Sequence, residues 1–81
     1  MHYVYVLRNT AGKLYTGYTE DLRRRFTEHN NHKVISTKAF APWKLVYYEV
    51  CESKKDALLR ERYLKSAWGK RYLKGRLRHS V

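Results

Sequence analysis

The stretch from Tyr15 to His29, YTGYTEDLRRRFTEH, constrains the fold of this chain more than any other segment. Its first residues are aromatic and β-branched, as in a strand, and Gly17 interrupts them. Thr19 is a favourable N-cap, and the two acidic residues after it suit a first helical turn, where the helix dipole favours negative charge. The segment therefore predicts a strand that passes almost directly into a helix.

One face of this helix combines apolar and basic residues. At about 100° per residue, Leu22, Arg25, Phe26 and His29 fall within one arc, while the two arginines before Arg25 point elsewhere. A guanidinium and an imidazole at a partly buried surface suit the binding of a phosphate. The alternative is that Arg25 pairs with a carboxylate and His29 is an ordinary hydrogen-bonded histidine near a helix C-terminus.

The residues before this stretch predict a β-hairpin. Residues 3–7 (YVYVL) alternate as a strand, and Asn-Thr-Ala-Gly at 9–12 is typical of a type I turn closed by a left-handed glycine. A three-residue loop would place Tyr5 and Tyr15 on one face, whereas a loop of two or four residues would separate them unless a bulge intervened. Gly17 falls on the face of Tyr15, where it either admits a ligand or another backbone, or marks a bulge.

The second half of the chain predicts a strand and two helices. Residues 30–42 are polar and aperiodic, so we expect a loop, with Lys38 as either a phosphate contact or an ordinary exposed lysine. Residues 43–50 carry large side chains on both faces, which is typical of a central strand. Ser53 begins a capping-box-like helix that Gly69 can end, and residues 70–78 predict a third helix.

Glu61 is anomalous in the predicted second helix. Helical spacing places its carboxylate on the apolar face with Ala57, Leu64 and Trp68. A buried carboxylate without a partner is strongly disfavoured, so something must compensate it. The candidates are an ion pair with Lys65 four residues later, an ion pair with Arg25 across the core, or a divalent metal ion.

Net charge narrows the class of partner. The chain has 81 residues, which we expect to form one domain over residues 1–81, and its 18 basic against 7 acidic residues give a net charge of +11. Such a surplus indicates a polyanionic partner, most often nucleic acid, with an anionic membrane surface as the second choice.

Cys51 is the only cysteine, which excludes an internal disulfide and a cysteine-based zinc site. His29 and His32 are spaced so that they could share a metal.

Nothing in the sequence predicts a membrane protein. The apolar runs are only a few residues long, and the N-terminus resembles a strand without the apolar core of a signal peptide. We therefore expect a cytoplasmic protein.

Together these residues resemble the GIY-YIG nuclease domain, and most closely its small single-domain members related to the N-terminal nuclease domain of excinuclease C. Tyr5 ends the triplet at residues 3–5, and the triplet at 15–17 begins ten residues after it with Tyr15. Arg25 and His29 follow, and Glu61 lies on a later helix. The resemblance covers nearly the whole chain.

The chain departs from the family pattern in three places. Its first triplet is Tyr-Val-Tyr where the family name has Gly-Ile-Tyr, and its second is Tyr-Thr-Gly where the name has Tyr-Ile-Gly. Several family members use an asparagine near the C-terminal end of the domain, and this chain has none beyond Asn31.

The resemblance implies an α/β fold with a small three-stranded antiparallel sheet flanked by three helices. It also implies hydrolysis of DNA phosphodiester bonds with one Mg²⁺ or Mn²⁺ ion held by Glu61. In this scheme Tyr5 is the general base, Tyr15 positions the attacking water, Arg25 neutralises the phosphate, and His29 orients or accepts a proton. The setting would be DNA repair or recombination.

Other residues take supporting roles in this interpretation. Gly17 is structural, and the expected nucleic-acid contacts are Arg24, Lys38, Arg62 and Lys65. Contacts of this kind carry little sequence information. The pKa of a free tyrosine is about 10, so a base active near pH 7 would need about 4 kcal/mol of extra phenolate stabilisation, for which Arg25, the metal and Lys65 are available.

The rival interpretation is a non-catalytic nucleic-acid-binding module on the same scaffold, and a third is a protein that depends on a partner to select its substrate. The rival predicts salt-sensitive DNA binding that is indifferent to Mg²⁺. The nuclease interpretation predicts that Glu61→Gln abolishes cleavage and preserves binding.

Overall fold

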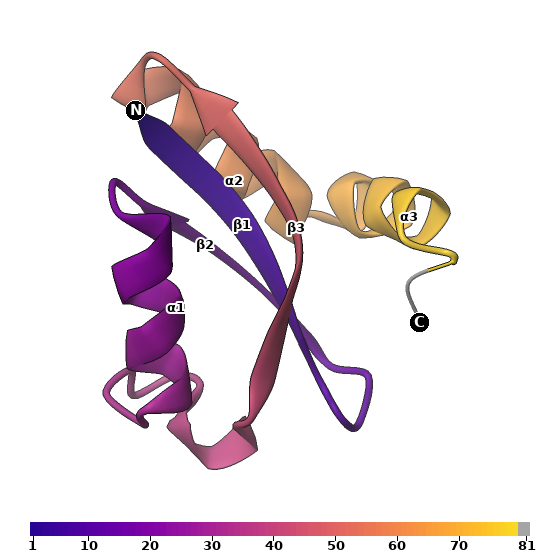
Figure 1. Ribbon diagram of the computed structural model, residues 1–81. Coiled ribbons are helices and arrows are strands. Elements are labelled where there is room, and N and C mark those ends of the chain that lie inside the picture. Colours follow the sequence, from indigo (N-terminus) through magenta and orange to yellow (C-terminus); the bar gives the residue numbers. More distant parts are fainter. Residues whose placement is uncertain (80–81) are drawn as a thin grey trace.

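The computed structural model describes residues 1–79 and shows three strands and three α-helices in that part of the chain (Figure 1). In chain order the elements are β1 (His2–Asn9), β2 (Leu14–Thr19), α1 (Leu22–Asn30), a short 3₁₀ helix η1 (Lys38–Phe40), β3 (Trp43–Cys51), α2 (Lys54–Lys65) and α3 (Ala67–Arg76). All strand pairs are antiparallel, so the expected fold class is confirmed. Within residues 1–79 no helix has the length and apolar character needed to cross a bilayer.

The sheet order is β2-β1-β3, which makes β1 the central strand. Its residues alternate between two buried faces, with Val4 and Val6 on one side and Tyr5 and Leu7 on the other, each at most 1% exposed. The prediction that residues 43–50 form a central strand was wrong. Large side chains on both faces of β3 suggested a central strand because this strand packs on both faces. As an edge strand it nevertheless leaves Tyr48 52% exposed.

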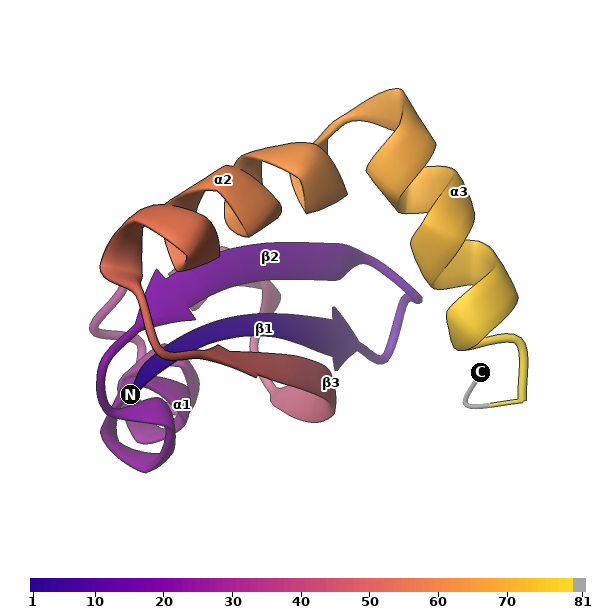
Figure 2. The same ribbon diagram turned by 90° about the horizontal axis from the view of Figure 1, so that it is seen from above.

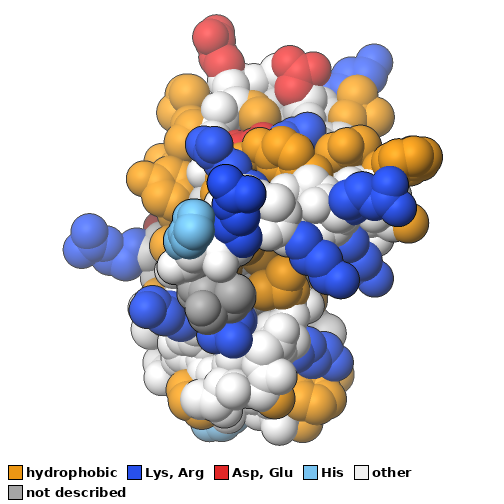
Figure 3. Space-filling view, turned by 90° about the vertical axis from the view of Figure 1, so that its right-hand side faces the viewer, with side chains coloured by type: hydrophobic (Ala, Val, Ile, Leu, Met, Phe, Trp, Pro, Cys, Tyr) orange, Lys and Arg blue, Asp and Glu red, His pale blue; other side chains and the backbone are white. Residues whose placement is uncertain are grey.

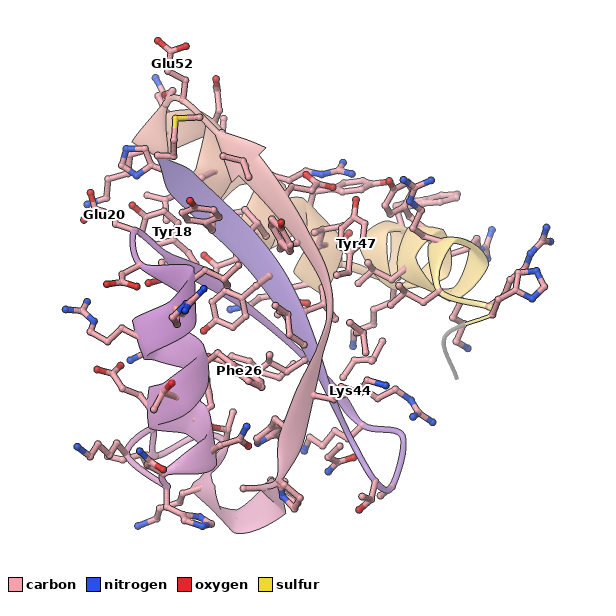
Figure 4. The ribbon with its side chains drawn as sticks, viewed as in Figure 1. Tyr18, Glu20, Phe26, Lys44, Tyr47 and Glu52 are labelled. Atoms are coloured by element: carbon pink, nitrogen blue, oxygen red, sulfur yellow. The ribbon has the colours of Figure 1, made fainter. Side chains whose placement is uncertain are left out.

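The core has one part on each face of the sheet. Figure 2 shows α2 beside β2 and α1 on the opposite side of the strands. Phe26 points from α1 toward the sheet (Figure 4) and packs with the part of the core that contains Tyr5, Leu7 and Trp43. The other part, under α2 and α3, consists of Val4, Val6, Ala57, Leu64, Leu73 and Leu77. Because apolar side chains of β1 enter both parts, this strand ties the helices of the two faces together.

The hairpin has the predicted three-residue loop. The Asn9 amide donates to the Lys13 carbonyl (3.0 Å), and Gly12 adopts φ +84°, the left-handed conformation that favours glycine. This turn sets the register in which Tyr5 lies opposite Gly17 and Leu7 lies opposite Tyr15. Residues 5 and 15 therefore share a face, as expected.

Helix α1 starts later than predicted. Thr19 is still paired in β2, and its hydroxyl accepts from the Asp21 amide (3.1 Å). Asp21 is the N-cap, and its carboxylate accepts from the Arg24 amide (3.0 Å). The two acidic residues therefore precede the helix, because strand pairing holds Thr19 in an extended conformation.

The junction between α2 and α3 also differs from expectation. Helix α2 ends at Lys65, and Ser66 caps the start of α3 by accepting from the Gly69 amide (3.2 Å). Gly69 is thus inside α3, where a Cβ would collide with the backbone of Tyr63 and Leu64. Trp68 leaves the predicted apolar face and is 68% exposed, because the chain turns before it.

The segment between α1 and β3 is anchored at both ends. The Asn30 side chain accepts from the Trp43 amide (2.6 Å) and donates to the Trp43 carbonyl (2.9 Å). The Trp43 indole donates to the Thr37 carbonyl (3.1 Å), and Val34 and Thr37 are buried. These bonds hold the segment against the end of α1 and place Thr37 beside His29.

Candidate functional site

Tyr5 lies at the centre of the candidate site. Strand β1 points its side chain toward α1, where the ring is 1% exposed. Its hydroxyl is 2.7 Å from Nε2 of His29, which comes from the last turn of α1. The hairpin and the helix thus meet at one hydrogen bond between two titratable groups.

Thr37 extends this contact into a chain of three hydrogen-bonding groups, and sequence reasoning missed it. Its hydroxyl is 2.7 Å from Nδ1 of His29, and both residues are fully buried. Because a hydroxyl can either donate or accept, each neutral tautomer of His29 satisfies both of its ring nitrogens. The available signal was a threonine in a polar segment just after a helix that ends in histidine, but no periodicity links the two residues.

Burial keeps both Tyr5 and His29 neutral near pH 7. It raises the pKa of Tyr5 to about 12, against a smaller lowering effect of the Arg25 guanidinium. Burial and the charge of Arg25 lower the pKa of His29 to about 4. We expect Arg25, the metal and Lys65 together to bring the pKa of Tyr5 toward 7; among the protein's own groups, desolvation of the phenolate outweighs the charge of Arg25 and the pKa rises.

Tyr15 joins the cluster through its ring. Its centroid lies 5.1 Å from that of His29 in an edge arrangement and 6.4 Å from that of Tyr5. Unlike Tyr5, the Tyr15 side chain is only partly buried. The two tyrosines and the histidine therefore form one aromatic group that opens to the surface at Tyr15.

Gly17 provides the space that Tyr5 occupies. The two residues are direct cross-strand partners, and the Tyr5 ring lies over the glycine. A Cβ at position 17 would come 3.0 Å from Tyr5 Cε1 and would collide with the hydroxyl. Gly17 is therefore explained by the close approach of another group and not by a bulge, and the group that approaches is the Tyr5 side chain.

Arg25 borders the cluster with its side chain 36% exposed. Its guanidinium donates to the Glu28 carboxylate (3.1 Å) and also acts on the Tyr5 hydroxyl. The alternative prediction of a carboxylate partner is therefore correct, and Glu28 is that partner. A half-exposed guanidinium beside a buried phenol still has donors free for a phosphate.

Glu61 reaches the site from α2, on the other side of the sheet. Its side chain is 19% exposed and accepts from Lys65 Nζ (2.9 Å), which confirms the predicted pair four residues apart. The ammonium of Lys65 also lies 6.0 Å from the centroid of the Tyr15 ring, and the charge of Glu61 acts on Tyr5. Arg62 lines the same surface hollow as Glu61 and Lys65.

The residues at the site fit a single, largely hydrated divalent cation. Glu61 is a half-buried carboxylate whose partner, Lys65, has a side chain 52% exposed and free to move away. Within residues 1–79 no group of three or more His, Cys, Asp or Glu side chains is placed to hold a metal. One carboxylate suits Mg²⁺, which retains most of its water ligands.

A metal shared by His29 and His32 is excluded by their hydrogen bonds. Both ring nitrogens of His29 are engaged, by Tyr5 and Thr37. The Nδ1 of His32 donates to the Lys38 carbonyl (3.0 Å) on the exposed surface.

Two of the expected nucleic-acid contacts lie outside this cluster. Arg24 is exposed on α1, 3.9 Å from the Glu28 carboxylate. Lys38 is exposed at the start of η1, immediately after Thr37.

Comparisons with known proteins identify the family of the chain. The model of the GIY-YIG catalytic domain matches residues 1–74, so the chain belongs to the GIY-YIG domain family. The resemblance inferred from the order of the two tyrosine triplets, the residues up to His29 and the later Glu61 is therefore confirmed. The matched model is that of a catalytic domain, and membership in this family suggests nuclease activity.

Similar proteins of comparable length occur in several bacteria. The UPF0213 protein of Staphylococcus saprophyticus is 41% identical over 66 residues, covering 80% of each chain. That of Clostridium perfringens is 44% identical over 66 residues, covering 80% of this chain and 71% of the relative. The solution NMR structure of the UPF0213 protein BH0048 from Bacillus halodurans is 36% identical and matches with a TM-score of 0.57 over 91% of this chain and 82% of that one.

Proposed function

We propose that this protein, as one domain over residues 1–81, is a metal-dependent endonuclease that hydrolyses DNA phosphodiester bonds with little sequence preference. The observation that carries the proposal is the buried 2.7 Å hydrogen bond between Tyr5 and His29, placed beside Tyr15, Arg25 and Glu61. Two titratable groups buried against each other at hydrogen-bond distance form a path along which a proton can move, and this supports the proposal.

Tyr5 and His29 act as a relay in this proposal. A water molecule attacks phosphorus and gives its proton to the Tyr5 oxygen while the Tyr5 proton passes to His29 Nε2. The bond from phosphorus to the leaving oxygen breaks, the leaving oxygen takes up a proton from solvent, and His29 then releases its extra proton. The tautomer required has Nδ1–H donating to Thr37, whose hydroxyl lies 3.5 Å from the Val34 carbonyl. The phenol therefore never has to ionise alone, which its pKa of about 12 would oppose.

The other residues bind and orient the substrate. The ring of Tyr15 restricts the attacking water, and Arg25 donates to the phosphate as negative charge grows on it. Glu61 would hold Mg²⁺ or Mn²⁺, which would supply stabilisation of the negative charge that builds up during the reaction. Lys65, whose side chain is 52% exposed, would then be available to the phosphate.

Phosphate contacts dominate substrate binding in this proposal. The net charge of +11 favours nucleic acid, and Arg24, Lys38, Arg62 and Lys65 are the proposed backbone contacts. A domain that contacts mainly phosphates recognises breaks or branches in DNA better than it recognises a base sequence. Such substrates arise in DNA repair and recombination, and a protein partner could add specificity.

The test is cleavage of labelled single-stranded, duplex, nicked and branched DNA with Mg²⁺ or Mn²⁺. Wild type is compared with Tyr5→Phe and Glu61→Gln, which are purified identically. We expect cutting by wild type only, with loss of at least about a hundredfold in both variants and binding retained. Equal cutting by all three would reveal a contaminant and refute the proposal.

One observation favours the rival binding module. The 2.9 Å pair between Glu61 and Lys65 already satisfies the carboxylate that a metal would need. The rival predicts no cleavage under any condition and DNA affinity unchanged by Mg²⁺, so the same panel separates the two functions.

A further inference from the structure

A groove runs from the candidate site along the outer edge of the sheet. Three adjoining hollows form it, of about 340, 240 and 340 Å³. The first contains Glu61 and Lys65, the second shares Lys65 and also touches Tyr15, and the third shares Leu14 and Leu73 with the second. We call this continuous surface the β2-edge groove.

Basic side chains follow the rim of the groove while its floor is apolar. Lys70 lines the middle hollow, and Lys74 and Arg8 line the far one. Lys70 and Lys74 are one helical turn apart on α3, so they project from the same face of that helix. Within residues 1–79 neither lysine has a carboxylate within ion-pair distance, nor does Arg8.

The same face of the molecule is basic at larger scale. Figure 3 shows Lys and Arg side chains spread over the side that carries α3 and the hairpin tip, with the acidic side chains near the top. Beyond Glu61, none of the residues that line the groove is acidic among those described. The charge of the groove therefore suits a polyanion along its whole length.

We infer that the β2-edge groove holds one nucleic-acid strand next to the phosphate at the candidate site, with Lys70, Lys74 and Arg8 binding its backbone. The inference rests on the proposed function, since the groove begins at Tyr15 and Lys65. Hollows of this size are at the small end of ligand pockets, so each takes about one nucleotide and the groove takes a strand, not a duplex. Apart from Tyr15 and Thr16, the uncharged side chains of the groove are leucines, which form no hydrogen bonds with base edges, so contacts through the basic side chains carry little sequence information.

The test compares two double variants of equal charge by fluorescence anisotropy in EDTA. Lys70→Gln with Lys74→Gln alters the groove, and Lys33→Gln with Lys55→Gln removes two exposed lysines that line none of the three hollows. The probes are a labelled single-stranded oligonucleotide of mixed sequence and its blunt duplex. All four positions are exposed, so folding should be unchanged, which circular dichroism checks.

We expect the groove variant to bind the single strand about five- to tenfold more weakly, with the slope of log affinity against log salt reduced by about one to two. The control should change affinity less than about twofold. Equal weakening by both double variants would show that only total charge matters, and an effect on the duplex alone would show that no single strand lies in the groove. Either result overturns the inference.

Because binding is measured without metal, the two proposals can fail separately. If wild type cuts DNA but both double variants bind alike, the groove is wrong and the nuclease stands. If wild type never cuts but the groove variant alone loses affinity, the nuclease is wrong and the strand path stands.

Discussion

Tyr5 is neutral because of where it lies. The strand buries its ring, and the cost of charging a phenol there exceeds what Arg25 returns, so its pKa rises to about 12. Burial and the charge of Arg25 lower the pKa of His29 to about 4, so its ring is neutral at neutral pH and the same two effects make it a weak base. The reactivity of the pair comes from the hydrogen bond that joins the two groups.

This relay predicts a flat pH profile. Between about pH 6 and pH 9 wild-type kcat/KM should change little, because His29 is already deprotonated, and activity should fall only toward a pH of about 4 as His29 gains a proton. In His29→Gln the phenol must ionise unaided, so the residual rate should rise about tenfold per pH unit. A wild-type profile that climbs steadily toward alkaline pH would instead identify a free phenolate as the base.

Thr37 is a positioning residue for His29. Thr37→Val keeps the shape but leaves Nδ1 unpaired, which should cost about 1–3 kcal/mol of unfolding free energy by urea titration. We also expect about a tenfold lower cleavage rate and a pH profile that becomes steeper, like that of His29→Gln. Thr37→Ser retains the hydroxyl and should restore rate and profile. A purely structural role would leave the pH profile flat in the valine variant.

At the scale of the elements, the site depends on how closely backbones approach one another. The hairpin loop sets the register that places Tyr5 over Gly17, and Ser66 lets α3 turn back so that Gly69 packs against the end of α2. On β3, Tyr47 lies on the side facing α3 (Figure 4), and its hydroxyl donates to Glu49 (2.6 Å), which accepts two bonds from Arg60 of α2. These contacts hold α2, and with it Glu61, beside the sheet.

Three glycine-to-alanine variants should separate these roles. Gly17→Ala displaces the Tyr5 ring and should abolish cleavage while costing about 1–3 kcal/mol of stability. Gly69→Ala meets backbone atoms that cannot move aside, so it should destabilise more. Gly75→Ala points into open space in a helix and should stabilise by about 0.5–1 kcal/mol with normal activity. Normal cleavage by Gly17→Ala would show that Tyr5 need not lie over the glycine.

At the scale of the whole molecule, the candidate site forms where elements from both faces of the sheet meet. Tyr5, Tyr15 and His29 lie on the α1 side, while Glu61 and Lys65 arrive from α2 on the other side. Unfolding therefore separates the residues of the site and, at the same time, exposes His29 to water.

Acid should destabilise the whole fold through His29. Its pKa is about 4 when folded and about 6.5 when unfolded, so the unfolded chain binds protons first as the pH falls. The free energy of unfolding should drop by about 2 kcal/mol between pH 7 and pH 5, as measured with urea. Glu49, whose pKa is lowered despite burial because Arg60 and Tyr47 hydrogen-bond to it, adds its loss only at lower pH.

The control is His29→Gln, which should be less stable but nearly independent of pH over this range. A direct NMR titration of the His29 ring in the wild type gives a second measurement. A midpoint near the ordinary histidine value of about 6.5 would contradict the depressed pKa, whatever the stability of the variant.

The sequence by itself determined the features that depend on neighbouring residues. Alternation in YVYVL gave β1, the Asn-Thr-Ala-Gly turn gave the register that places Tyr5 and Tyr15 on one face, and helical spacing turned Arg25 and His29 inward. These patterns were also enough to indicate the family. Each of them depends on the geometry of a few neighbouring residues and can therefore be recognised in the sequence.

Only the tertiary structure decided which strand is central, where α1 begins, where α2 ends, and what each functional group touches. Thr37 meets His29 because Asn30 and Trp43 fix the connecting segment, and Glu61 pairs with Lys65 at the edge of the sheet. The pKa of Tyr5 also depends on the tertiary structure, because spacing shows which charges are near a group but not how completely the fold removes water from it.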